Sequence, residues 1–184
     1  MIKLTTPLTK EKIKTLHAGD QVLLSGTIYT GRDAAHKRLI KLIEEGKELP
    51  FDLKDQVIYY VGPTPTKPGH VFGSGGPTTS GRMDAYAPKM LSLGLYSMIG
   101  KGYRSPAVKE AIKHYCGIYF GAIGGAGAYI GKCVKSSTII AFDDLGAEAI
   151  RKLEVIDFPL TVIIDCYGED LYEMGRSQYL STIK

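Results

Sequence analysis

The sequence predicts an α/β domain with a mixed sheet and short flanking helices. Runs rich in β-branched and aromatic residues alternate with short amphipathic segments, and glycine or proline separates most of them. The length of 184 residues suits one domain with a sizeable core. A hydrophobic content of 44% and a net charge of +4 exclude a chain that is mainly disordered.

The first elements follow from local patterns. Residues 20–30 predict a strand, because β-branched and aromatic residues dominate them. Residues 33–45 carry apolar side chains at helical spacing and predict a helix, with Asp33 as N-cap and Gly46 as C-cap. A continuous apolar run at 57–61 predicts the next strand.

Glycine and proline shape the middle of the chain. Three prolines make residues 62–69 a rigid loop, and residues 70–82 predict a short strand that runs into a glycine loop. Apolar residues from Met83 to Leu91 then mark a helix, whose first turns Pro88 makes irregular.

The second half continues the alternation of strands and helices. Ser105 and Pro106 predict a helix start, and Gly117 its end. The remaining elements are expected as strands at 97–100, 118–120, 137–142 and 160–166, and as helices at 126–134 and 147–152. The tail from Leu171 to Lys184 fits either state.

Composition excludes several classes of protein. No stretch approaches the roughly 20 apolar residues of a membrane span, and the N-terminus lacks a signal-peptide pattern, so we expect a cytoplasmic protein. No run of basic residues indicates nucleic-acid binding. Cys116, Cys133 and Cys166 form no Cys-x-x-Cys pair, which favours buried reduced thiols over metal ligands.

Three cationic residues stand next to glycine at predicted strand ends: Arg32, Arg82 and Lys101. Ligands bind to open α/β sheets at such ends, and a helix that starts there favours an anion. Two planar guanidinium groups suit two carboxylates or one phosphate, each held by two hydrogen bonds, so the pattern predicts a site for a small dianion. The alternative is that these cations are solvated or cap helix ends.

The glycine loop resembles phosphate-binding patterns only in part. Residues 76–81 have the G-x-x-x-x-G spacing, but Arg82 and Met83 follow where a Walker loop has Lys and then Ser or Thr. Thr78 and Thr79 could bind an anion or position a proton, whereas Thr79 or Ser80 could equally be an N-cap.

His36 lies one turn into the helix that follows Arg32. The plainest interpretation of this histidine is a ring on a helix face that is bonded to a carbonyl group or to water.

Four segments together resemble the class I (iron–sulfur) fumarate hydratases. They are TGRDAAHKR at 30–38, GPTTSGRMD at 76–84, GKGYRS at 100–105 and EVIDFPLTVIID at 154–165. The chain is similar to the β subunit, which is equivalent to the C-terminal domain of single-chain members, from about residue 4 to 175. The β subunit of L-tartrate dehydratase shares this architecture.

The resemblance implies one swivelling β/β/α domain over residues 1–184, in an enzyme that reversibly hydrates fumarate to L-malate. It also implies a separate α subunit, which would hold a [4Fe–4S] cluster and join this chain in an α2β2 assembly. This chain alone would then be inactive. The alternatives are a tartrate dehydratase β subunit, which would yield oxaloacetate, and a non-catalytic anion- or nucleotide-binding module.

The resemblance also assigns residues to the site. Arg32 and Arg82 would bind substrate carboxylate oxygens, with Lys101 beside them, and Thr78 and Thr79 would line the same pocket. Thr78 would be the candidate base for the carbon-bound proton, helped by Lys101 and Arg82. An alkoxide base needs a strongly lowered pKa, and hence a dry site with cations close by.

Overall fold

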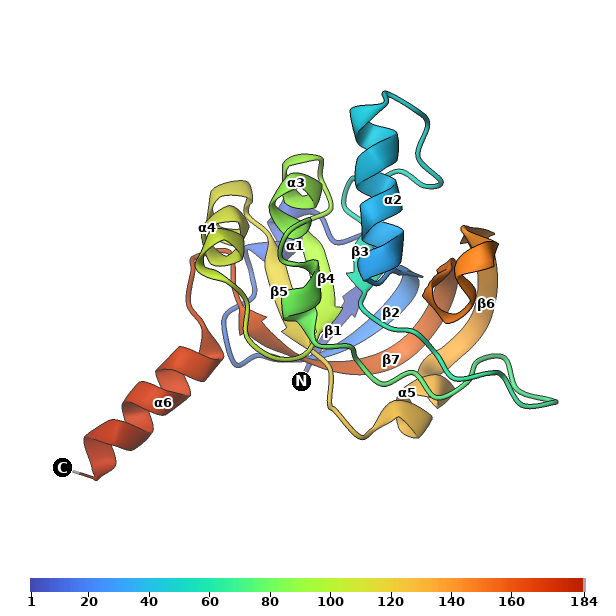
Figure 1. The fold of residues 1–184 in the computed structure, drawn as a ribbon. Coiled ribbons are helices and arrows are strands. Elements are labelled where there is room, and N and C mark those ends of the chain that lie inside the picture. The colour runs from blue at the N-terminus through green and yellow to red at the C-terminus, as the bar shows by residue number, and fades with distance from the viewer. Residues whose placement is uncertain (184) are drawn as a thin grey trace.

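The computed structural model describes residues 1–183 and has one seven-stranded sheet in the order β1-β2-β3-β4-β5-β7-β6 (Figure 1). An additional pairing of β2 with β7 closes five of the strands into a barrel-like ring. The predicted mixed α/β fold is confirmed. The strands are β1 (Ile2–Thr5), β2 (Gln21–Thr30), β3 (Val57–Tyr59), β4 (Ser97–Gly100), β5 (Ile118–Gly121), β6 (Val134–Ala141) and β7 (Ile150–Ile164).

The helices are short, and three of them cover one side of the sheet. In Figure 1, α2, α3 and α4 lie together above the sheet, whereas α6 extends away from the body of the molecule. Within residues 1–183 no helix combines the length and the apolar character that crossing a membrane requires. The helices are α1 (Lys10–Ile13), α2 (Asp33–Glu44), α3 (Ala87–Ser92), α4 (Pro106–Tyr115), α5 (Gly127–Cys133) and α6 (Leu171–Thr182), with 3-10 turns η1 (Ser80–Met83) and η2 (Asp143–Glu148).

The strands β1 to β5 run parallel to one another, and β7 runs antiparallel to β2, β5 and β6. The register pairs Thr30 with Tyr59, and Gly100 with Gly121, at the last residues of these strands. The carboxyl ends of β2, β3, β4 and β5 therefore lie along one rim of the ring. The segments that follow these ends meet there.

The core consists of two hydrophobic clusters on the two faces of the sheet. One cluster draws a buried side chain from every ring strand: Leu24, Tyr59, Ile99, Phe120 and Phe158. The other joins the helices to the opposite face, through residues such as Leu39 of α2, Met90 of α3 and Ile112 of α4. Because neighbouring side chains on a strand point to opposite faces, each ring strand contributes to both clusters.

Three local expectations are wrong. Residues 147–152 are not a helix, because they divide between η2 and β7, a strand of 15 residues that includes 160–164 of the strand expected at 160–166. No strand forms at residues 70–72. The helix α4 ends at Cys116, which takes the left-handed conformation at φ 57°, and not at Gly117.

Replacement of Phe158 by Ala should destabilise the fold strongly. The ring of Phe158 is buried and packs edge-on against Tyr59, with the centroids 5.2 Å apart. Loss of such a ring costs about 3–5 kcal/mol in the free energy of unfolding, which urea titration measures. Ile156→Ala, two residues away on β7 at a side chain that is 52% exposed, should cost about 1 kcal/mol or less. Equal losses would contradict the assignment of Phe158 to the ring interior.

Candidate functional site

The structure brings the three predicted cationic residues to the same rim. Arg32 is separated from β2 by Gly31 alone and is the residue before α2, Lys101 follows β4 directly, and Arg82 lies in η1. Asp33 links the two arginines, because its Oδ2 lies 2.7 Å from Nη2 of Arg82 and its Oδ1 lies 3.8 Å from Nε of Arg32. Arg82 remains half exposed, with 50% of its side chain accessible, so its guanidinium can still reach a ligand.

The two threonines lie on the segment that runs across the ends of β3 and β4. The backbone N–H of Thr78 donates to the carbonyl of Tyr60 at 2.7 Å, and Thr79 forms a parallel bridge with Lys101. Thr79 occupies the N-cap position of η1, as one alternative expected, but neither threonine caps this turn through its hydroxyl. Both hydroxyls are therefore left without that structural role, beside the lysine.

Two carboxylates moderate the positive charge of the rim. Glu148 of η2 forms an ion pair with Arg32 (Oε1 to Nη2, 3.2 Å), and its Oε2 accepts from the N–H of Ala34 at 3.2 Å. The three cations of the rim, Arg32, Arg82 and Lys101, carry a formal charge of +3. Asp33 and Glu148 carry −2, so the net formal charge of the rim is +1.

Asp33 is ionised at neutral pH. Its partial burial raises the pKa of the carboxyl, but its own backbone N–H and Arg82 hydrogen-bond the carboxylate, and Arg32 adds a nearby positive charge. The net effect is a lowered pKa.

His36 supports Arg32 from below. Its ring is buried, and Nδ1 lies 2.8 Å from the carbonyl oxygen of Arg32. Because a carbonyl can only accept, Nδ1 carries a proton. Burial lowers the pKa of His36 to about 4, against the opposing effect of this hydrogen bond, and the charge of Arg104 adds to the lowering. The expectation of a helix histidine bonded to a carbonyl is confirmed.

The sequence analysis missed Arg104, whose side chain is fully buried beneath the rim. Its Nε donates to Oδ1 of Asp84 at 2.7 Å, and its Cζ lies 4.9 Å from the ring centroid of Tyr119 and 5.5 Å from that of Tyr60. Asp84 also accepts from the N–H of Ser105 at 2.6 Å. No local signal separates such a buried arginine from a surface one, because its partners come from distant parts of the chain.

The cysteines do not fit an iron–sulfur cluster. Cys133 and Cys166 are buried, Cys116 is half-buried, and all three are free thiols. Over residues 1–183 no three His, Cys, Asp or Glu side chains gather closely enough to hold a metal ion. The expectation of buried reduced thiols is thus confirmed for Cys133 and Cys166.

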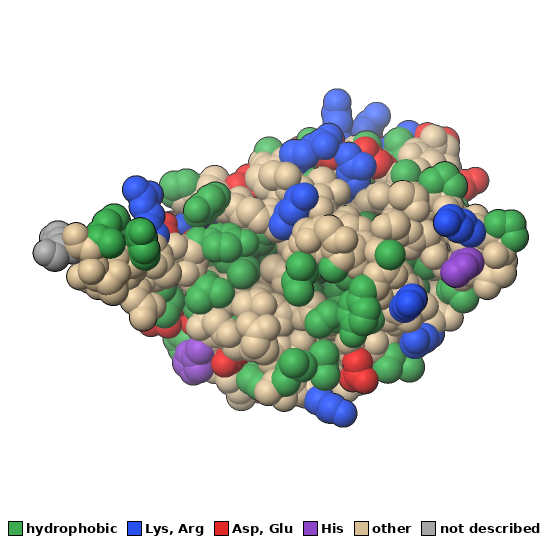
Figure 2. Space-filling model, turned by 90° about the horizontal axis from the view of Figure 1, so that it is seen from below, with side chains coloured by type: hydrophobic (Ala, Val, Ile, Leu, Met, Phe, Trp, Pro, Cys, Tyr) green, Lys and Arg blue, Asp and Glu red, His purple; other side chains and the backbone are tan. Residues whose placement is uncertain are grey.

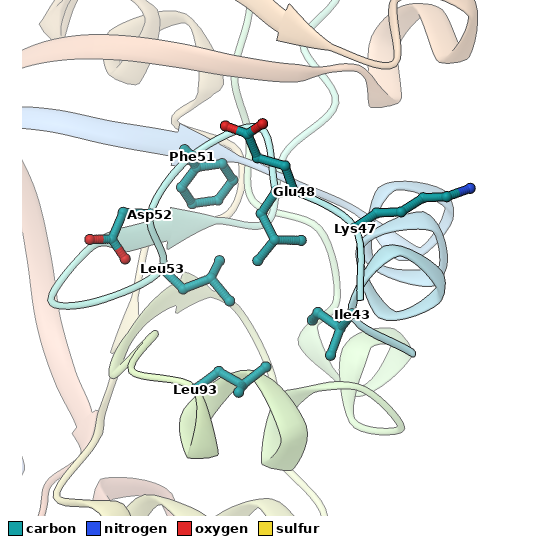
Figure 3. A pocket seen from close by; sticks show the side chains of 8 residues that line it. Ile43, Lys47, Glu48, Phe51, Asp52, Leu53 and Leu93 are labelled. Atoms are coloured by element: carbon teal, nitrogen blue, oxygen red, sulfur yellow. The ribbon is translucent and has the colours of Figure 1, made fainter. Parts of the chain in front are cut away.

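A cavity of about 460 Å³ lies away from the rim (Figure 3). Ile43, Phe51, Leu53 and Leu93 line it, with Lys47 beside them. Ile43 is near the end of α2 opposite to Arg32, and at about 1.5 Å per residue the two ends are roughly 16 Å apart. The cavity is therefore separate from the cationic rim.

The fold and the rim together define a mixed α/β domain with two arginines, a lysine and two threonines in the segments that follow its parallel strands. A family model described as "Fumarase C-terminus" matches residues 1–175, and the chain belongs to this family.

Curated relatives are of two lengths. The chain is 45% identical over 152 residues to the anaerobic class I fumarate hydratase of Escherichia coli K12. This match covers 82% of this chain and 28% of that protein. The chain is 40% identical over 175 residues to fumarate hydratase 2 of Leishmania major, covering 93% of this chain and 31% of that protein. The chain thus spans about a third of these relatives. A protein of Methanocaldococcus jannaschii, provisionally named L(+)-tartrate dehydratase subunit beta, is 38% identical over 90% of this chain and 88% of its own length.

The buried neutral His36 should make stability depend on pH. Its pKa in the folded chain, about 4, lies below the value near 6.5 in the unfolded chain, so the unfolded chain binds a proton first as the pH falls. The stability that neutral His36 contributes is fully present above pH 6.5. It is lost as the pH falls toward 4, which lowers the free energy of unfolding by about 3 kcal/mol. Urea titrations should show a flatter pH dependence in His36→Gln than in the native chain. The exposed His114→Gln is the control, and an unchanged slope in His36→Gln would refute the prediction.

Proposed function

We propose that this chain is the substrate-binding part of a hydro-lyase that reversibly hydrates fumarate to L-malate, with residues 1–184 acting as one β-subunit domain. The observation that carries the proposal is the convergence of Arg32, Arg82 and Lys101 on one rim of a fumarase-family domain. A C4 dicarboxylate is a small dianion, and cations held on the ends of rigid strands match its charge.

In this proposal the two arginines bind the carboxylates of the substrate. Arg32 is held by Glu148 and by Asp33, so its guanidinium is oriented before a ligand arrives. Arg82 is held by Asp33 alone and is more exposed, so it can turn from Asp33 to a substrate carboxylate. Thr78 and Thr79 would complete the pocket with their hydroxyl groups.

The chemical step in the direction of dehydration removes a proton from the carbon next to a carboxylate. The electron pair left behind spreads onto that carboxylate, so negative charge grows on its oxygens. Lys101 and Arg82 would stabilise this charge, which is the type of interaction that lowers a barrier most. Thr78 would take the proton, and Lys101, which is bridged to the neighbouring Thr79, would help to supply the field that an alkoxide needs.

We further propose a separate α subunit, which holds the [4Fe–4S] cluster and joins this chain in an α2β2 assembly. A relative named as a β subunit, which this chain matches over 88% of its length, supports a separate partner subunit. The cysteines of this chain do not gather into a ligand set, which fits a cluster held elsewhere.

The surface also suits such a partner. In Figure 2, hydrophobic side chains gather in the middle of the face seen from below, with Lys and Arg side chains around them. Ile123 and Tyr129, by α5, are 64% and 59% exposed.

Two alternatives differ in substrate. The match to 88% of the length of the provisional tartrate dehydratase β subunit favours the same arrangement acting on tartrate to give oxaloacetate. The spacing of residues 76–81 favours a non-catalytic anion- or nucleotide-binding module. Against this module, the loop leads into the four-residue 3-10 turn η1, which lacks the helix N-terminus that a Walker loop uses.

Arg82→Ala should abolish most of the turnover of the complex with a cluster-bearing α subunit, mixed under anaerobic conditions. Loss of a contact that strengthens in the transition state costs about 3–4 kcal/mol, or roughly 10²–10³-fold in kcat. The fold should survive, because Asp33 keeps Arg32 as a partner. Lys89→Ala, at an exposed cation on α3, is the control, and near-normal turnover in Arg82→Ala would defeat the proposal.

Parallel assays of the same complex with fumarate, L-tartrate and ATP would separate the three functions. Turnover of fumarate well above that of tartrate is the expected result. Magnesium-dependent binding of ATP without either turnover would support the nucleotide-binding module instead.

A further inference from the structure

We propose that Tyr119 is a positioning residue that fixes Lys101 at the rim through the hydroxyl of Ser80. The inference rests on the proposed function only in that Lys101 is taken to contact the substrate. Neither Tyr119 nor Ser80 is assigned a role by the family resemblance, and both are fully buried beneath the rim.

The three residues are joined by a relay of hydrogen bonds. The N–H of Lys101 donates to Oγ of Ser80 at 3.0 Å, the N–H of Ser80 donates to the carbonyl of Lys101 at 2.9 Å, and the two side-chain hydroxyls of Ser80 and Tyr119 lie 2.9 Å apart. Oη of Tyr119 also lies 3.0 Å from the carbonyl oxygen of Gly102. Because a carbonyl can only accept, the tyrosine donates to Gly102 and the serine donates to the tyrosine. Each hydroxyl proton then has one acceptor, and the relay holds the backbone on both sides of Lys101.

Packing leaves Ser80 little freedom to move. A Cβ atom at Gly100 would lie 1.9 Å from Oγ of Ser80, so this hydroxyl occupies the space that a side chain on the last residue of β4 would take. The η1 segment and the end of β4 are therefore in direct contact. A displacement of Ser80 therefore shifts Gly100 and, with it, Lys101, the residue that follows Gly100.

Arg104 holds the ring of Tyr119 in place. Its guanidinium lies 4.9 Å from the ring centroid, and Asp84 anchors the guanidinium at 2.7 Å. Burial raises the pKa of the Tyr119 hydroxyl, so the proton of the relay stays on the tyrosine at neutral pH. Lys101 itself is exposed, with a flexible stem, and depends on its backbone for its position.

The test is a double-mutant cycle in the complex with the α subunit. Tyr119→Phe should lower kcat/KM about tenfold when Lys101 is present, but less than about twofold in the Lys101→Ala background, because a residue that acts through Lys101 has nothing left to position. Tyr59→Phe is the matched control, since it also removes a buried hydroxyl that donates to a backbone carbonyl, that of Gly75. Its effect should be the same in both backgrounds.

Equal losses from Tyr119→Phe in the two backgrounds would overturn the inference. Lys101→Ala with native activity would instead refute the role given to Lys101 under the proposed function, so the two failures are distinguishable.

The second measurement is amide hydrogen exchange of the full chain. It is the deciding test in the case that Lys101→Ala has no measurable turnover. Tyr119→Phe should speed exchange at the Lys101 N–H about tenfold, whereas Tyr59→Phe should leave it unchanged. Unchanged exchange in Tyr119→Phe would overturn the inference. Ser80→Ala, which removes the other hydroxyl of the relay, takes the place of Tyr119→Phe if that variant does not fold.

Discussion

The antiparallel pairing of β2 with β7 is the constraint on which the rest of the structure depends. It runs from Gln21 opposite Thr161 to Tyr29 opposite Lys152 and closes the ring. The strands β3, β4 and β5 have only three or four residues each, too few to form a stable sheet by themselves. The long strand β7 holds them between its own pairings with β2 and β5, so their carboxyl ends stay together as one rim.

The rim combines positive charge with internal restraint. Each arginine has a carboxylate partner, whereas Lys101 is restrained by its backbone. Beneath them lies a layer of buried polar groups, among them neutral His36 and charged Arg104. Such groups are costly to bury unless they are hydrogen-bonded, so the bonds that they make beneath the rim restrain it.

Local patterns were sufficient to predict β2, β4, α2 and the start of α4. The expected Ser105 cap of α4 is confirmed, whereas α2 is capped at Arg32 and Glu45 and not at Asp33 and Gly46. Local patterns also located the three cations, because each stands beside glycine, although only Arg32 and Lys101 follow a strand and Arg82 lies in η1. The long strand β7 escaped prediction, since Pro159 lies within it and its pairings on both edges override the helix-like pattern at 147–152. The role of Glu148 could not be predicted, because its partner Ala34 lies 114 residues away in the sequence, a separation that no local pattern spans.

The ion pair between Asp33 and Arg82 has a consequence for selectivity. In the proposed site, a ligand carboxylate that approaches Arg82 would meet a guanidinium already paired with a carboxylate of the chain itself, so binding would be an exchange between two similar partners. The exchange gains little for an anion with one charge, because one contact is given up for each contact made. A molecule with a second negative group, placed to reach Arg32 at the same time, has an advantage that simple inorganic anions of the cell lack.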